Sequence, residues 1–88
     1  MVRVLVEATH NPPLTEEFLQ FEIKVPNPCL VARNVRWLRS FVSRDRRRTI
    51  CELEATDADT VREAYRQAGY SVERVWVANI VESDAESF

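Results

Sequence analysis

Three side chains of this 88-residue sequence could bind a soft metal ion: its single histidine, His10, and its two cysteines, Cys29 and Cys51. Imidazole and thiolate groups are the ligands that nickel and zinc take from proteins. The cysteines are 22 positions apart, unlike the close pairs of zinc-binding loops. A predicted helix between His10 and Cys29 would hold them about 20 Å apart, at ~1.5 Å rise per residue. We therefore expect no metal site within one chain, and reduced cysteines that pack as small hydrophobic residues.

A run of arginines between residues 44 and 48 would suit an anionic partner, but Asp45 lies within it. The net charge is −2, and Glu82, Asp84 and Glu86 contribute −3 of it, which leaves +1 for the rest of the chain. Nucleic-acid binding depends on a surplus of cations, so we expect a solvated turn here and no nucleic-acid partner. The sequence also lacks a glycine-rich phosphate loop, a nucleophile elbow and a paired-histidine metal motif.

The elements that must position these residues follow from their periodicity. Alternating apolar residues predict strands, and capping residues such as Thr15 and Asn27 predict helix starts. Asn34 and Gly69 are placed where a helix ends in a left-handed residue. In chain order we predict a strand at 2–8, a helix from Thr15 to about Lys24, a helical turn at 28–33, strands at 35–43 and 48–55, a helix at 58–68 and a strand at 73–81.

This β-α-β-β-α-β order predicts a ferredoxin-like α+β sandwich, a four-stranded antiparallel sheet with two helices on one face. We expect one domain over residues 1–81 and a disordered acidic tail over 82–88. The apolar share is 45%, and no apolar run approaches the ~20 residues of a membrane span. No signal-peptide pattern opens the chain, so we expect a cytoplasmic protein without a membrane partner.

The face of the sheet without helices is the main candidate site. A tight hairpin at Asp45 would pair Phe41 with Ile50, Arg39 with Glu52 and Trp37 with Glu54 on this open face. The first and last strands would add further apolar side chains. The predicted binding or dimer face therefore comprises Trp37, Arg39, Phe41, Ile50, Glu52, Glu54, Leu5 and Trp76.

Aromatic side chains mixed with paired charges are typical of association surfaces. We therefore expect the open face to pack on a second copy, forming a homodimer that can hold a small-molecule ligand at this face. An enzyme is the alternative use of the same residues. Arg39 would then hold an anionic substrate, and Glu52 or Glu54 would act as a base if burial raised its pKa. An ion pair in an interface is the simpler interpretation, and no catalytic residue is assigned.

Several blocks of the sequence carry a resemblance to a known family. The most specific is the strand from Val35 to Ser43, VRWLRSFVS. The others are Pro12–Glu17, Asn27–Leu30, Thr49–Glu52, Ala55–Ala58, Val61–Ala64 and Ala68-Gly69 through Val75-Trp76. Together, over residues 2 to about 81, they resemble the small nickel-binding-protein-like family of ferredoxin-like domains, a domain family of unknown function, and in particular its cyanobacterial-type branch.

The resemblance implies a ferredoxin-like fold, frequent dimers and nickel binding in some members. Many relatives carry histidine at the positions of Arg39 and Ala64, and these departures remove the imidazole ligands that nickel favours. We therefore expect no resident cofactor and interpret the chain as a dimeric, ligand-binding protein. The alternatives are a nickel or other transition-metal protein, and a dimeric α+β barrel-like monooxygenase or isomerase.

Overall fold

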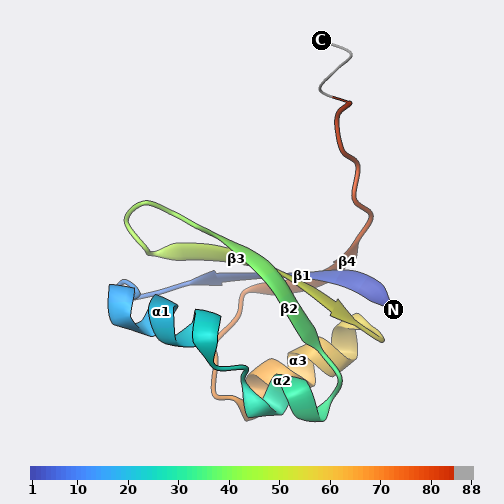
Figure 1. Cartoon of the computed structure of the whole chain (residues 1–88), viewed down its shortest axis with the longest axis horizontal. Helices are drawn as coiled ribbons and strands as arrows, with labels where there is room; N and C mark the ends of the chain where they lie inside the picture. Colours follow the sequence, from blue (N-terminus) through green and yellow to red (C-terminus); the bar gives the residue numbers. More distant parts are fainter. Residues whose placement is uncertain (85–88) are drawn as a thin grey trace.

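The structure, a computed structural model, describes residues 1–84 and confirms the predicted α+β fold (Figure 1). The four strands form one antiparallel sheet in the order β2-β3-β1-β4. The helices lie on one side of this sheet, and the other side carries no helix (Figure 1). The elements in chain order are β1 (Val2–Thr9), α1 (Glu16–Lys24), α2 (Pro28–Ala32), β2 (Arg36–Val42), β3 (Arg48–Ala55), α3 (Ala58–Gln67) and β4 (Arg74–Ala78).

The helix boundaries follow the predicted caps. The Thr15 hydroxyl accepts a hydrogen bond from the Phe18 backbone N–H at 3.1 Å, and the Asn27 side chain accepts one from Cys29 at 2.9 Å. Each cap satisfies a backbone donor that the first helical turn leaves without a partner. Asn34 adopts the predicted left-handed backbone, with φ of 57°, and so ends the α2 turn.

The hydrophobic core lies between the sheet and the two helices α2 and α3. Leu53, Val4 and Val6 from the sheet and Val61 from α3 are the largest fully buried side chains. Complete burial of such a side chain contributes about 1.5–3 kcal/mol. The core thus fixes α3 and the central strands β1 and β3, the elements on which the candidate sites are built.

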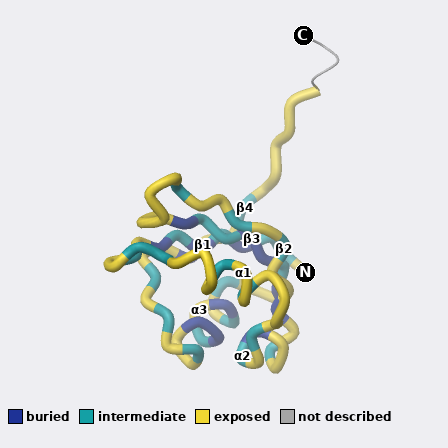
Figure 2. The backbone as a smooth tube through the Cα atoms, turned by 60° about the vertical axis from the view of Figure 1, so that its left-hand side comes forward, coloured by how far each residue is buried: buried dark blue, intermediate teal, exposed yellow. Residues whose placement is uncertain are grey.

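Helix α1 is attached differently, because none of its residues is buried. In Figure 2 the residues of α1 are coloured as exposed or intermediate, whereas α3 includes buried residues. Polar contacts hold its two ends: Glu16 pairs with Arg46 at 3.2 Å, and Glu22 accepts a hydrogen bond from the Tyr70 hydroxyl at 2.7 Å. A helix held by its ends and not by its face leaves room between itself and the sheet.

The last strand ends at Ala78, three residues before the predicted boundary at 81. Residues 79–84 then run away from the sheet on the side opposite α2 and α3 (Figures 1 and 2). Of the tail that we predicted to be disordered, residues 85–88 lie outside the described part of the chain. Within residues 1–84, no helix is long and apolar enough to span a lipid bilayer.

Candidate functional site

One residue predicted for the open face lies on the other side of the sheet. We predicted that Trp37 pairs with Glu54, but a bulge at Leu38 shifts the register, and Trp37 pairs with the core residue Leu53. An inserted residue in one strand turns every side chain beyond it to the opposite face. Arg36 takes the place opposite Glu54 instead. The assignment of Trp37 to the open face was therefore wrong.

The other predicted residues do share the open face. Arg39 pairs with Glu52 and Phe41 with Ile50, as the hairpin register predicted, and Leu5 is the neighbour of both Glu52 and Trp76. We call this surface the open face. Its predicted members are Leu5, Arg39, Phe41, Ile50, Glu52, Glu54 and Trp76.

Glu52 is the centre of the open face and is only 5% exposed, although no helix covers it. Two arginines enclose its carboxylate: Arg39 donates through Nε at 2.6 Å, and Arg3 donates through a guanidinium N–H. The hydrogen bond from Arg39 and then that from Arg3 lower the pKa of Glu52, so it is a carboxylate at neutral pH. This direction argues against the predicted alternative in which burial raises the pKa and makes Glu52 a base.

The second candidate site is a cavity of about 820 Å³ between α1 and the helix side of the sheet, which we call the α1 cavity. Its floor consists of β-strand side chains, among them Val6, Ala8 and Val42. Helix α1 covers it with Phe18 and Leu19. The side wall comes from α3 and the segment that follows it, with Tyr65, Tyr70 and Val72.

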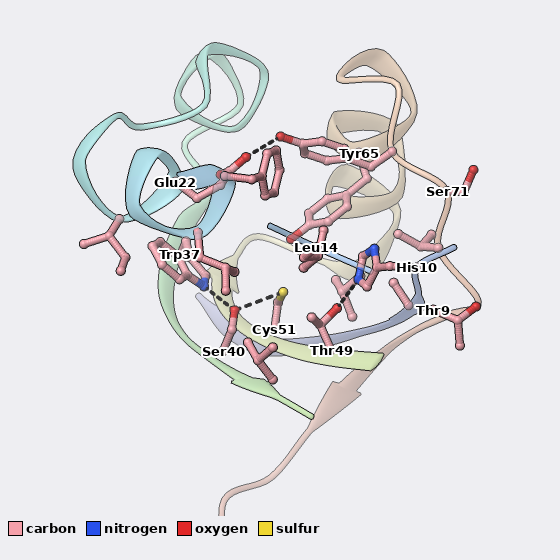
Figure 3. Close-up of a pocket in the computed structure, with 18 of the residues that line it drawn as sticks. Thr9, His10, Leu14, Glu22, Trp37, Ser40, Thr49, Cys51, Tyr65 and Ser71 are labelled. Carbon is pink, nitrogen blue, oxygen red and sulfur yellow. Dashed lines mark hydrogen bonds between the residues drawn. The ribbon is translucent and has the colours of Figure 1, made fainter. Parts of the chain in front are cut away.

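The polar groups of the floor form two short hydrogen-bonded sets (Figure 3). In the first, Trp37 donates from Nε1 to Ser40 Oγ at 2.8 Å, and Ser40 Oγ donates to Cys51 Sγ at 3.1 Å. In the second, a ring nitrogen of His10 lies 2.9 Å from Thr49 Oγ1. These donors and acceptors are thus held in place by one another and border a space whose walls are largely apolar.

Two tyrosines complete the side wall, and their rings meet edge to face with centroids 5.7 Å apart. Tyr65 is buried, and burial raises the pKa of its hydroxyl, as does the neighbouring Cys51 thiol. Burial and the carboxylate of Glu22 raise the pKa of Tyr70 to about 12. Both hydroxyls therefore stay protonated at neutral pH and can donate hydrogen bonds.

No pattern in the sequence predicted this cavity. Ser40, Thr49 and Cys51 lie on the helix side of the sheet and line it. The sequence of α1 holds a signal that could have found it, because its apolar residues do not all fall on one helical face. Two of them, Phe21 and Ile23, are accordingly 58% and 61% exposed.

The three potential metal ligands do not meet in the chain. His10 and Cys51 both border the α1 cavity, while Cys29 lies on α2 and is not part of its lining. Among residues 1–84, no three His, Cys, Asp or Glu side chains are placed to hold a metal ion together. The donor set of one described chain therefore does not fit a nickel centre.

Comparisons with known proteins agree with this fold. The family model described as "Nickel responsive protein SCO4226-like" matches residues 5–77. Among solved structures, the chain is similar to the crystal structure of SCO4226 from Streptomyces coelicolor A3(2), with a TM-score of 0.71 and 13% sequence identity over 91% of this chain and 99% of that one. No curated protein matches the sequence. Because the family match spans most of the chain, the protein belongs to this SCO4226-like family.

Proposed function

We propose that this protein binds a small, uncharged and largely apolar molecule in the α1 cavity. The volume of about 820 Å³ is the observation that carries the proposal. Ligand pockets in proteins enclose about 300–1,000 Å³ and combine apolar walls with a few fixed polar groups. At ~30 Å³ per molecule, the same space would take about 27 waters. An apolar ligand that displaces this water removes apolar surface from contact with water, which is favourable.

The charges around the cavity favour an uncharged ligand over an acid. Arg39, the arginine that borders the cavity, is engaged by Glu52 on the open face. The carboxylates at the rim are engaged as well, Glu16 by Arg46 and Glu22 by Tyr70. The uncharged polar groups of the lining include the hydroxyl, imidazole and thiol groups of the floor and the side chains of Asn11 and Ser71. A flat, apolar molecule with one hydroxyl group matches this set.

The test is a calorimetric titration with 2-naphthol, a flat aromatic molecule with a single hydroxyl. A ligand efficiency of about 0.5 kcal/mol per non-hydrogen atom lies between the bounds for very small and drug-sized ligands. For the eleven non-hydrogen atoms of naphthol it gives about −5.5 kcal/mol, which corresponds to a Kd of about 0.1 mM. We expect one molecule bound per chain.

Two variants locate the binding. Ala8→Phe puts a ring on the cavity floor, where Ala8 is 8% exposed, and should abolish binding. Val31→Phe adds a ring on α2, where Val31 is 60% exposed and outside the cavity lining, and should bind as the wild type does. The proposal fails if naphthol does not bind, or if both variants bind it equally well.

We also propose that the open face packs on a second copy. Phe41 and Trp76 are 59% and 44% exposed there, beside charges that alternate in sign. Such a face is self-complementary, as a twofold dimer requires. Light scattering at micromolar concentration should give twice the mass of one chain.

Nickel binding is the second candidate function, favoured by the description of the family. Since one described chain does not offer three ligands, an ion would need donors from more than one copy. Imidazole is the nitrogen ligand that nickel accepts readily, and His10 is the single histidine. Titration calorimetry with nickel chloride, on the wild type and on His10→Ala, tests this candidate. A histidine-dependent heat would support it, and no heat would exclude it.

A further inference from the structure

We propose that residues 79–84, which we call the C-terminal arm, clasp the second copy of the chain that covers the open face. The inference rests on the proposed dimer and adds the segment that holds it together. It starts from the direction of the arm, which leaves β4 on the side of the sheet opposite α2 and α3 (Figures 1 and 2). Any body seated on the open face meets the arm there.

Contacts at the base of the arm agree with this direction. The residue where β4 ends, Ala78, lies beside Arg3 on β1, and Arg3 reaches Glu52 at the centre of the open face. Glu82 is close enough to Arg39 to help raise the pKa of its guanidinium, an effect secondary to that of Glu52. The arm therefore rises over the open face and not beyond the edge of the molecule.

The length of the arm matches the thickness of a second layer. Six extended residues span about 20 Å at ~3.3–3.6 Å each. Two sheets that pack face to face lie about 10 Å apart. The first half of the arm, with Ile80 and Val81, thus lies level with the interface. The second half begins with Glu82, which lies within electrostatic reach of Arg39 on the open face of its own chain.

The chemistry of the arm changes at the same point. Ile80 and Val81 are 45% and 93% exposed, and Val81 has the largest exposed fraction of the large hydrophobic side chains described. Glu82 is the first acidic residue after them. The open face offers both complements: exposed apolar rings, and the guanidinium groups of Arg36 and Arg39, whose side chains are 71% and 62% exposed. A second copy seated on the open face would therefore cover Ile80 and Val81, which their own chain leaves exposed.

The test measures the dimer dissociation constant by sedimentation velocity, under reducing conditions, for the full chain and three variants. Val81→Asp places a charge in the apolar half of the arm. Phe41→Asp places one on the open face itself. Val31→Asp is the matched control, since Val31 is exposed on α2, away from both surfaces. We expect a dimer for the full chain and for Val31→Asp, and at least tenfold weaker association for Val81→Asp and Phe41→Asp.

The outcomes separate the arm from the dimer. If Phe41→Asp dissociates the dimer while Val81→Asp leaves its dissociation constant unchanged, the open face is the interface and the arm inference is wrong. If the full chain is a monomer, or if Phe41→Asp has no effect, the dimer through the open face fails and the arm inference fails with it. Circular dichroism of each variant verifies that the chain is folded. Val81 lies outside every helix and strand, so the effect of Val81→Asp on association does not arise from unfolding of the core.

Discussion

Replacement of Tyr70 by phenylalanine should loosen α1 while the rest of the fold stays closed. The Tyr70 hydroxyl donates to Glu22 of α1 at 2.7 Å and accepts from Asn27, the α2 cap, at 3.2 Å. The nine residues of α1 bury no side chain. Isolated helices shorter than ~12–15 residues are marginal in water. The helix therefore depends on a few polar contacts at its ends, and this is one of them.

The magnitude follows from the two hydrogen bonds that the hydroxyl makes. A hydrogen bond to a charged group contributes about 1.5–3 kcal/mol and a neutral one about 1 kcal/mol. Tyr70 is half-buried, so we take the lower end and expect a loss of about 1.5 kcal/mol in the free energy that keeps α1 closed. Since about 1.4 kcal/mol is a factor of ten, α1 amides should exchange with solvent about ten times faster.

Amide hydrogen exchange followed by NMR measures this effect residue by residue. In Tyr70→Phe, the amides of Leu19 and Val25, which bond within α1, should exchange about tenfold faster, while those of Val4 and Leu53 in the sheet should change little. Tyr65→Phe is the matched control, because the Tyr65 hydroxyl interacts mainly with Cys51, and no hydrogen bond joins it to α1 among the described residues. If α1 and the sheet exchange at the same rate and respond equally to Tyr70→Phe, α1 is part of the rigid core and the reasoning is refuted.

Two further predictions concern the fold. Glu63 should contribute to acid sensitivity, because Arg66 and then Gln67 lower its pKa from 4.5 to about 2. A lowered folded-state pKa gives stability that is present above pH 4.5 and is lost as the pH falls toward 2. The Tm of Glu63→Gln should therefore fall less over that range than the Tm of the wild type. An equal fall in both proteins would contradict this role of Glu63. Asn34→Ala should destabilise the fold by about 1 kcal/mol, because a left-handed backbone is costly for alanine, and its Tm should fall by about 4–8 °C, whereas Asn34→Gly should melt near the wild type. Equal melting of both variants would contradict the role of the φ of 57° at Asn34.

The α1 prediction bears on the proposed ligand site as well. A molecule in the α1 cavity would contact α1, the wall of the cavity with no buried residue. Bound naphthol should slow amide exchange in α1, because it fills the space beneath the helix and adds contacts to it. Unchanged exchange in α1 at saturating naphthol would place the ligand outside the cavity.

Local sequence rules determined the elements and their order. The caps Thr15, Asn27 and Asp57 mark where the helices begin, and Asn34 and Gly69 mark left-handed ends. These signals depend on one residue and its immediate neighbours, so they can be read without the fold. The alternation of β1 and the hairpin between β2 and β3 then sufficed for the sheet and for most of the open face, including the Arg39–Glu52 pair.

The tertiary structure decided two features that no local rule contains. The bulge at Leu38 places Trp37 on the cavity side of the sheet and not on the open face where we predicted it. Such a bulge depends on how the whole of β2 packs. The α1 cavity exists because α1 stands off the sheet, a distance set by loops and long-range contacts such as Tyr70 to Glu22. His10, Thr49, Cys51 and Tyr65 come from separate elements and meet only there. Their identities are known from the sequence, but only the packing of α1 against the sheet brings these residues together around one cavity.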